Sequence, residues 1–159
     1  MPQRESITST NTGRLALALL EGASLRVRGL RDAPPPAPLP EGRRLLLFPG
    51  EGARPLVAGD AAGELPPILL VPDGTWSQAR KLCKREPILA GAEPVALPPA
   101  APGRYGLRRN APAGTVCTLE AIARALGVLE GPEIEAHLLT ALDRFVERSR
   151  AAREGRFER

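Results

Sequence analysis

The chain has 159 residues, of which 43% are hydrophobic and 25% are charged, so it can form one folded domain and is neither disordered nor low-complexity. Two cysteines and one histidine are too few for a disulfide scaffold or a protein-built zinc cage, and the longest uncharged stretches are too short to cross a bilayer. We therefore expect a cytoplasmic protein with no bound metal, no membrane span and no N-terminal leader peptide.

The distribution of the basic residues is more informative than the net charge of +4. Four cations lie within residues 80–85 and three within residues 104–109, while the rest of the chain is net negative. Two concentrated basic segments are typical of a protein that binds an anionic partner such as nucleic acid. An alternative explanation is a GC-rich genome, because this would favour arginine over lysine without any partner.

The first elements in chain order are a short helix, a strand and a loop. Residues 8–20 predict an apolar helix whose N-cap is Asn11 or Thr12. Residues 25–29 have the composition of a strand. The proline-rich residues 32–40 predict a surface connection.

Two short apolar runs follow at residues 44–48 and 67–72, and proline or glycine bounds them. Such runs are typical of buried strands in a parallel sheet that is covered on both faces. Residues 94–97 are a third strand candidate further along the chain.

Three helices are predicted in the second half. Residues 76–85 form one that ends before Pro87, with its cations on one side and Trp76, Ala79 and Cys83 on the other. Residues 119–127 show apolar spacing typical of a helix, and the last helix opens at Pro132.

The last helix carries the single histidine, His137, at the edge of its apolar face. We expect it to be partly buried and without a chemical role. The basic C-terminus from Arg148 onward is expected to be a solvated helix end, with an RNA-contacting tail as the alternative. Strands that alternate with helices indicate an α/β fold.

The turn at residues 72–76 follows a predicted buried strand and carries Asp73, Thr75 and the single tryptophan, Trp76. In open α/β sheets, ligands lie beyond the carboxyl ends of the strands, where this turn must be. A structural explanation is also open: Asp73 caps the next helix with the help of Thr75, and Trp76 fills the core.

The Asp-x-Thr-Trp signature at this turn resembles that of the DTW-domain family, and the agreement extends over nearly the whole chain. We therefore expect a single domain of residues 1–159. Four further segments resemble motifs of that family, in the same order along the chain. They are Asn11–Leu15, Leu47–Gly50, Tyr105–Arg108 and Cys117–Ala121.

The resemblance implies an enzyme that transfers the 3-amino-3-carboxypropyl group of S-adenosylmethionine to N3 of a uridine in tRNA and releases methylthioadenosine. It also implies a SPOUT-like α/β fold with a mostly parallel sheet flanked by helices and a C-terminal trefoil knot that forms the donor pocket. By position, the residues that would bind the donor are Phe48, Pro49, Val71, Pro72, Leu107, Arg108, Cys117, Thr118 and Glu120.

Elementary chemistry is compatible with these expectations. Asp73 is the best candidate for a general base, or for a group that orients the uracil and balances the sulfonium charge. Thr75 could hydrogen-bond the donor or the base, and Trp76 could stack on a base or on adenine. The residues expected to hold RNA are Arg80, Lys81, Lys84, Arg85, Arg104 and Arg109, and the fork of Arg108 or Arg109 would also suit a carboxylate.

The sequence departs from the family pattern in two places. The cysteine-rich, zinc-binding segment that often opens family members is absent, and Met1–Glu5 resembles a His-Pro-x-Glu motif without its histidine. We interpret the chain as an N-terminally short version, or one whose start is misassigned.

Cys117 stands where the family usually has serine. Its sulfur is a weak acceptor, so either the capping box with Glu120 is weakened or Thr118 is the cap. No histidine lies near Cys117 in sequence, so a nucleophilic role is not expected. Two alternative functions stay open, a SPOUT-type RNA methyltransferase and a non-catalytic RNA-binding module.

Overall fold

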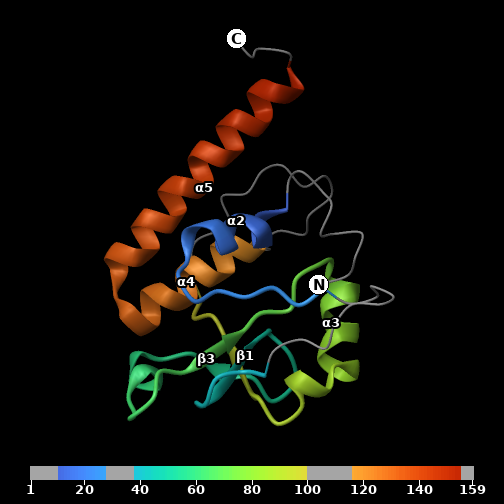
Figure 1. Cartoon of the computed structure of the whole chain (residues 1–159), viewed down its shortest axis with the longest axis vertical. Coiled ribbons are helices and arrows are strands. Elements are labelled where there is room, and N and C mark those ends of the chain that lie inside the picture. Colours follow the sequence, from blue (N-terminus) through green and yellow to red (C-terminus); the bar gives the residue numbers. More distant parts are fainter. Residues whose placement is uncertain (1–10, 28–37, 100–115, 155–159) are drawn as a thin grey trace.

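The computed structural model describes residues 11–27, 38–99 and 116–154 (Figure 1). Four strands, four α-helices and two 3-10 helices lie in these ranges. In chain order they are α2 (Thr12–Leu19), β1 (Arg44–Leu47), β2 (Arg54–Pro55), η1 (Ala58–Ala61), β3 (Ile68–Leu70), α3 (Trp76–Arg85), η2 (Pro87–Leu89), β4 (Glu93–Ala96), α4 (Thr118–Glu130) and α5 (Pro132–Arg153).

The four strands form one parallel sheet in the order β2-β4-β1-β3. Strand β1 lies in the interior of the sheet, with Leu45 opposite Leu69 of β3 and Glu93 of β4. Its residues Leu45–Leu47 are buried, as expected for a continuous apolar run covered on both faces. The prediction of an α/β fold with a parallel sheet flanked by helices is confirmed.

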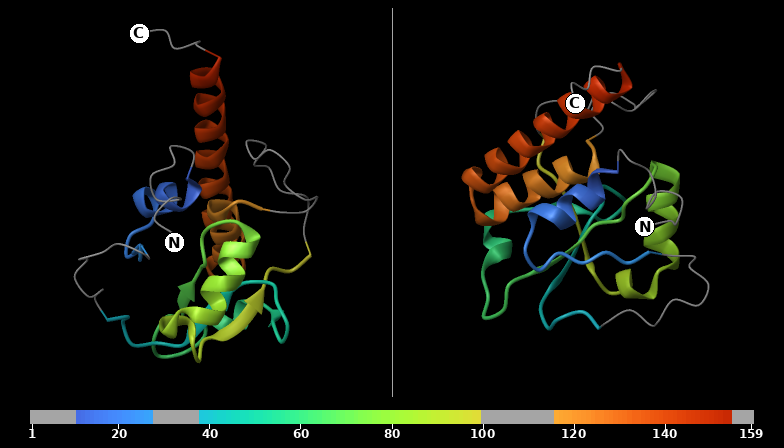
Figure 2. Two further views of the ribbon diagram at one scale, coloured as in Figure 1. Left: turned by 90° about the vertical axis from the view of Figure 1, so that its right-hand side faces the viewer. Right: turned by 45° about the horizontal axis from the view of Figure 1, so that its top comes forward.

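Helix α4 lies between the sheet and α5, and it therefore contributes to two apolar clusters. Leu119 and Ala123 of α4 pack with Leu138 of α5 and with α2. Ala125, from the same helix, packs with Leu45 and the other buried residues of the sheet. The C-terminal half of α5 projects beyond this core, and α3 lies at the opposite side of the molecule (Figures 1 and 2).

Several predicted boundaries are corrected by the structure. Residues 25–27 are not a strand, because no described strand pairs with them, and residues 28–29 lie outside the described ranges. Helix α4 runs three residues further than predicted and ends where Gly131 takes a φ of +121° before Pro132. His137 is exposed rather than partly buried.

The sequence patterns do not predict β2, which has only two residues. It forms because Pro55 and its neighbours pair with β4 at the edge of the sheet, where proline is tolerated. Ion pairs from Arg54 to Asp60 and to Glu93 hold it there. Residues 107–115, the main part of the expected knot segment, lie outside the described residues, and the knot stays a prediction.

Candidate active site

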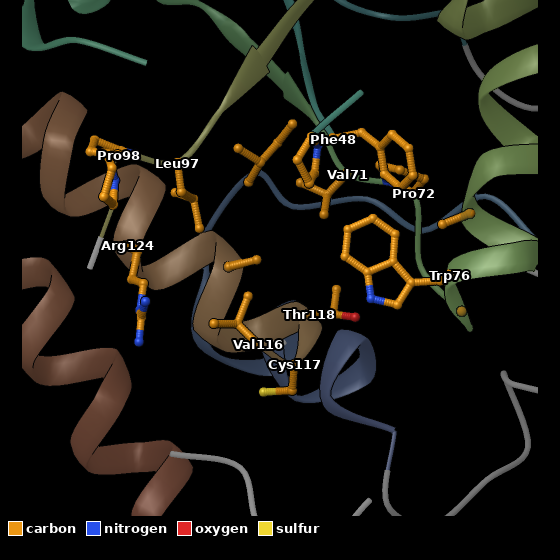
Figure 3. Close-up of a pocket in the computed structure, with 16 residues that line it drawn as sticks. Phe48, Val71, Pro72, Trp76, Leu97, Pro98, Val116, Cys117, Thr118 and Arg124 are labelled. Carbon is orange, nitrogen blue, oxygen red and sulfur yellow. The ribbon is translucent and has the colours of Figure 1, made fainter. Parts of the chain in front are cut away.

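A cavity of about 350 Å³ opens at the carboxyl ends of three parallel strands (Figure 3). Residues that follow β1, β3 and β4 line it together with residues from the N-terminal halves of α3 and α4. They include Phe48, Pro49, Val71, Pro72, Gly74, Trp76, Leu97, Pro98, Val116, Cys117, Thr118 and Arg124. This is the place at which open α/β sheets bind their ligands.

Asp73 lies beside this cavity and is only 7% exposed. The amide Nδ2 of Asn11 donates to Asp73 Oδ2 at 3.3 Å, and the hydroxyl of Thr118 donates to Oδ1. Asn11 also caps α2, because its Oδ1 accepts from the backbone N–H of Arg14 at 2.9 Å. One carboxylate therefore ties together the turn after β3 and the first turns of α2 and α4.

The packing around Asp73 leaves no space for a further side-chain atom at Gly13. A Cβ atom there would lie 2.7 Å from Asp73 Oδ2, which is too close for a non-bonded contact. Gly13 is therefore required for the approach of α2 to the carboxylate. The N-terminal turns of both α2 and α4 face Asp73, and the partial positive charge of helix N-termini attracts anions.

The structural explanation of the Asp73 turn is wrong in its main point, since Thr75 and not Asp73 caps α3. Thr75 Oγ1 accepts from the N–H of Gln78 at 3.4 Å, and the Gln78 side chain accepts from the N–H of Thr75 at 2.6 Å. Gly74, which lies between Asp73 and Thr75, has a φ of +142°, a backbone conformation that glycine adopts readily. Thr75 itself is exposed, caps the helix and does not line the cavity.

Trp76 does not fill the core, because it is 42% exposed. Its ring centroid lies 5.3 Å from that of Phe48, with an angle of 56° between the ring planes, and both residues line the cavity. Figure 3 shows this aromatic pair at one end of the cavity and Arg124 at the other. The arrangement leaves aromatic surface available for stacking on a base.

Cys117 is the N-cap of α4, and its sulfur accepts from the N–H of Glu120 at 3.5 Å. Burial raises the pKa of this thiol and so favours its protonated form. That Cys117 is not a nucleophile stays a prediction. The alternative in which Thr118 is the cap is wrong, because the Thr118 hydroxyl donates to Asp73 instead.

Glu120, predicted to bind the donor, is fully buried and does not line the cavity. It accepts from Arg124 Nη2 at 2.8 Å, and Arg124 is the member of this pair that lines the cavity. Sequence reasoning missed Arg124, although its i+4 spacing from Glu120 was a usable signal. It also missed Leu97, Pro98 and Val116, which carry no recognisable chemistry.

The cations of α3 are all exposed, and in the described part of the chain none of them forms an ion pair. These residues are Arg80, Lys81, Lys84 and Arg85. The other predicted ligands of RNA or donor, Arg104, Leu107, Arg108 and Arg109, lie outside the described residues.

Residues 11–27, 38–99 and 116–154 contain neither a candidate metal site nor a candidate membrane span. No three of the histidine, cysteine, aspartate and glutamate side chains gather where they could bind a metal ion. No helix there combines the length and the apolar character that a membrane span needs.

Comparison with known proteins identifies a family and a similar curated protein. The family described as the DTW domain matches residues 1–150 of the chain. The chain is also 36% identical over 100 residues to tRNA-uridine aminocarboxypropyltransferase 2 of Drosophila melanogaster. That alignment covers 62% of this chain and 39% of the fly protein, so the chain spans about two fifths of the length of that relative. No solved structure is significantly similar to the chain.

Proposed function

The chain belongs to the DTW-domain family, and we propose that it transfers the 3-amino-3-carboxypropyl group of S-adenosylmethionine to N3 of a uridine in tRNA. The name of the fly relative, a tRNA-uridine aminocarboxypropyltransferase, supports tRNA as the substrate and a uridine as the target. The donor and the modified atom come from the family resemblance. The SPOUT-like classification of the fold and the cytoplasmic location of the protein also stay predictions.

One observation carries this proposal: four of the five motif segments that resemble the family meet at one site. Asn11 belongs to the first segment, Phe48 to the second, Asp73 to the third and Thr118 to the fifth, and they lie at or beside the same cavity. The fourth, residues 105–108, lies outside the described ranges. Convergence of distant segments on one concave site is what an active site requires.

The cavity has the character expected of a site for a small organic donor. Its volume of about 350 Å³ is within the usual range for ligand sites, and its walls are mainly apolar with a few polar groups. Arg124 brings a guanidinium to the lining, and this group suits the carboxylate of the aminocarboxypropyl arm. We assign donor binding to Phe48, Pro49, Val71, Pro72 and Cys117, and on resemblance alone to Leu107 and Arg108.

The reaction requires the chain to remove a weakly acidic imide proton and to align two substrates. S-adenosylmethionine supplies an electrophilic γ-carbon next to a sulfonium. In the transfer, the N3–H bond of uracil breaks, N3 bonds to the γ-carbon, and the γ-carbon–sulfur bond breaks to release methylthioadenosine. Asp73, a buried carboxylate beside the cavity, is the group to which we assign the uptake of the proton.

The exposed face of α3 supports an RNA ligand for the same site. Helix α3 starts at Trp76, which lines the cavity, and presents its cations from there onward. Phosphates bound along this face would place a nucleotide near the aromatic pair. Base stacking on Trp76 and phosphate contacts along α3 are the two ways in which such a surface binds RNA.

The experiment that tests the proposed function is mass spectrometry of the small-molecule product formed with bulk tRNA and S-adenosylmethionine. We expect methylthioadenosine, together with a tRNA uridine whose mass has increased by the aminocarboxypropyl group. S-adenosylhomocysteine as the product would instead identify a SPOUT-type RNA methyltransferase. No product, with tRNA binding intact, would identify a non-catalytic RNA-binding module.

A further inference from the structure

Asp73 and Thr118 form a pair of which only one member reaches the cavity. Thr118 lines the cavity, and its hydroxyl donates to Asp73 Oδ1. Asp73 is buried and is not among the residues that line it. Figure 3 shows the Thr118 oxygen on the side of the residue that faces the Trp76 indole. A substrate in the cavity therefore meets the hydroxyl oxygen before it meets the carboxylate.

This hydrogen bond determines what the hydroxyl can offer to a substrate. A threonine hydroxyl has one proton to donate and two lone pairs that can accept. Since the proton of Thr118 is directed at Asp73, the oxygen can only accept a hydrogen bond from a group in the cavity.

The other oxygen of Asp73 also has a hydrogen-bond partner. The Asn11 amide donates to it through Nδ2 and uses its own Oδ1 to cap α2, so the amide cannot rotate without losing one bond. The carboxylate and the hydroxyl are thereby fixed before any substrate binds.

We propose that Thr118 accepts the N3–H of the target uracil and passes its own hydroxyl proton to Asp73 as N3 attacks. N3 retains the electron pair of the broken N–H bond, Thr118 Oγ1 gains that proton, and Asp73 Oδ1 takes the proton that Thr118 releases. Thr118 is then the catalytic residue that touches the substrate, and Asp73 is a positioning residue that acts through it. This inference depends on the proposed function.

The same geometry selects the base. Uracil carries a proton on N3 and is a donor there, whereas the N3 of cytosine is an acceptor without a proton. An oxygen that can only accept would face the lone pair of cytosine N3 without a hydrogen bond. A buried polar group left unpaired in this way is unfavourable and produces strong discrimination.

The test compares Thr118→Val, which has nearly the same shape without the hydroxyl, with Thr118→Ser, which keeps it. We expect Thr118→Val to lower the rate of methylthioadenosine formation by about a hundredfold or more, as for loss of a general base. Thr118→Ser should stay within about threefold of wild type. The dissociation constant for S-adenosylmethionine alone, measured by calorimetry, should change by less than about threefold in both variants. Thr140→Val, on the exposed side of α5, is the matched control for removal of a hydroxyl.

A double-mutant cycle with Asp73→Asn gives a readout that a structural role would not produce. If the two residues act as one unit, Asp73→Asn, Thr118→Val and the double variant lose about the same factor in kcat. Losses that multiply in the double variant would show independent action and overturn the proposal. Should Thr118→Val melt well below wild type, Thr118→Ala takes its place, since alanine is the strongest helix former.

The remaining outcomes separate the two levels of inference. Wild type that releases methylthioadenosine while Thr118→Val keeps its rate overturns the role of Thr118 alone. A large loss of donor affinity in Thr118→Val with unchanged kcat would make Thr118 a donor-binding residue. Wild type that forms no methylthioadenosine overturns the proposed function and this inference with it.

Discussion

Two aspartates are almost equally buried in this protein, Asp60 at 5% exposed and Asp73 at 7%, but they are held in opposite ways. Arg54 donates to both oxygens of Asp60, at 2.8 and 2.7 Å, and Arg43 also donates to it. These hydrogen bonds, those of Arg54 above all, hold the pKa of Asp60 well below its usual range. Asp73 accepts from a neutral amide and a neutral hydroxyl, and within the described ranges no cation contacts it.

This difference in hydrogen-bond partners gives Asp60 a structural role and leaves Asp73 suited to accept a proton. Asp60 joins η1 to β2, and Glu93 of β4 extends the network through the same two arginines. A carboxylate paired with guanidinium groups is a weak base and is poorly suited to accept a proton. The ion pairs of Asp60 instead connect the elements at this edge of the sheet. Asp73 contacts no cation in the described ranges and is connected to the cavity through Thr118, which is the arrangement a proton acceptor needs.

The largest effect on the reaction in this comparison is expected for Gly13→Ala. The new Cβ would lie 2.7 Å from Asp73 Oδ2 and must displace the carboxylate or α2. We expect methylthioadenosine formation to fall by about tenfold or more, because a displacement of about an ångström in the residues that support a reaction can cost this much. The melting temperature should change little, because the atoms that the new Cβ crowds belong to side chains and not to the backbone.

The control for this change is Gly59→Ala in η1, where a Cβ would meet nothing within 4 Å. Its rate should equal that of wild type. A Gly13→Ala variant with the wild-type rate would show that the position of Asp73 does not matter for turnover.

The second largest effect is expected on tRNA affinity and concerns the cations of α3. Unlike the arginines that bind Asp60, they form no ion pair in the described part of the chain. We expect the double substitution of Lys81 and Lys84 by alanine to weaken tRNA binding by about tenfold at 0.1 M salt, because contacts to phosphates are lost. Each such contact contributes about 0.7–0.9 to the slope of log affinity against log salt. The slope should flatten by one to two contacts in a salt titration. Affinity for S-adenosylmethionine should not change.

Arg144 and Arg148 of α5 are exposed and provide the matched control for charge. Their replacement by alanine should leave the salt slope as in wild type. An equal flattening in both double variants would overturn docking specific to α3. It would mean long-range attraction by net charge or an RNA contact at the C-terminal part of α5.

The smallest effect on the reaction is expected for Asp60→Asn, which should leave turnover within about twofold of wild type. It should lower the melting temperature at pH 7 by about 3–10 °C. Hydrogen bonds to charged groups stabilise a protein more than neutral ones do, and in a chain of this length the loss of such a bond shifts the melting temperature by several degrees. A large loss of turnover in a folded variant would end the distinction between the two aspartates.

The pH dependence sharpens the same prediction. The folded pKa of Asp60 lies below its unfolded value, so its stabilisation is present above about pH 4 and is lost as the pH falls through the folded pKa. The melting temperature of wild type should therefore fall more steeply below about pH 4 than that of Asp60→Asn. Glu51→Gln, an exposed change of the same charge, should keep the wild-type steepness.

Local patterns in the sequence were sufficient for most of the elements. The apolar runs that became β1, β3 and β4 and the helical spacing of α3, α4 and α5 involve only neighbours in sequence, so their physical cause is visible there. Strand β2 could not be predicted, because two residues become a strand only when a partner strand pairs with them. For the same reason the predicted strand at residues 25–27 is wrong.

The sequence also identified Asp73 as the carboxylate to examine, but its surroundings left two explanations open. Only the tertiary structure decided between them, since the partners that hold Asp73 are Asn11 and Thr118, which lie 62 and 45 residues away. The N-cap of α3, by contrast, depends only on residues close in sequence, and Thr75 is that cap. A side chain's local bonds follow from its neighbours in sequence, whereas its access to a cavity depends on how distant segments pack. That packing places Thr118 between Asp73 and the cavity.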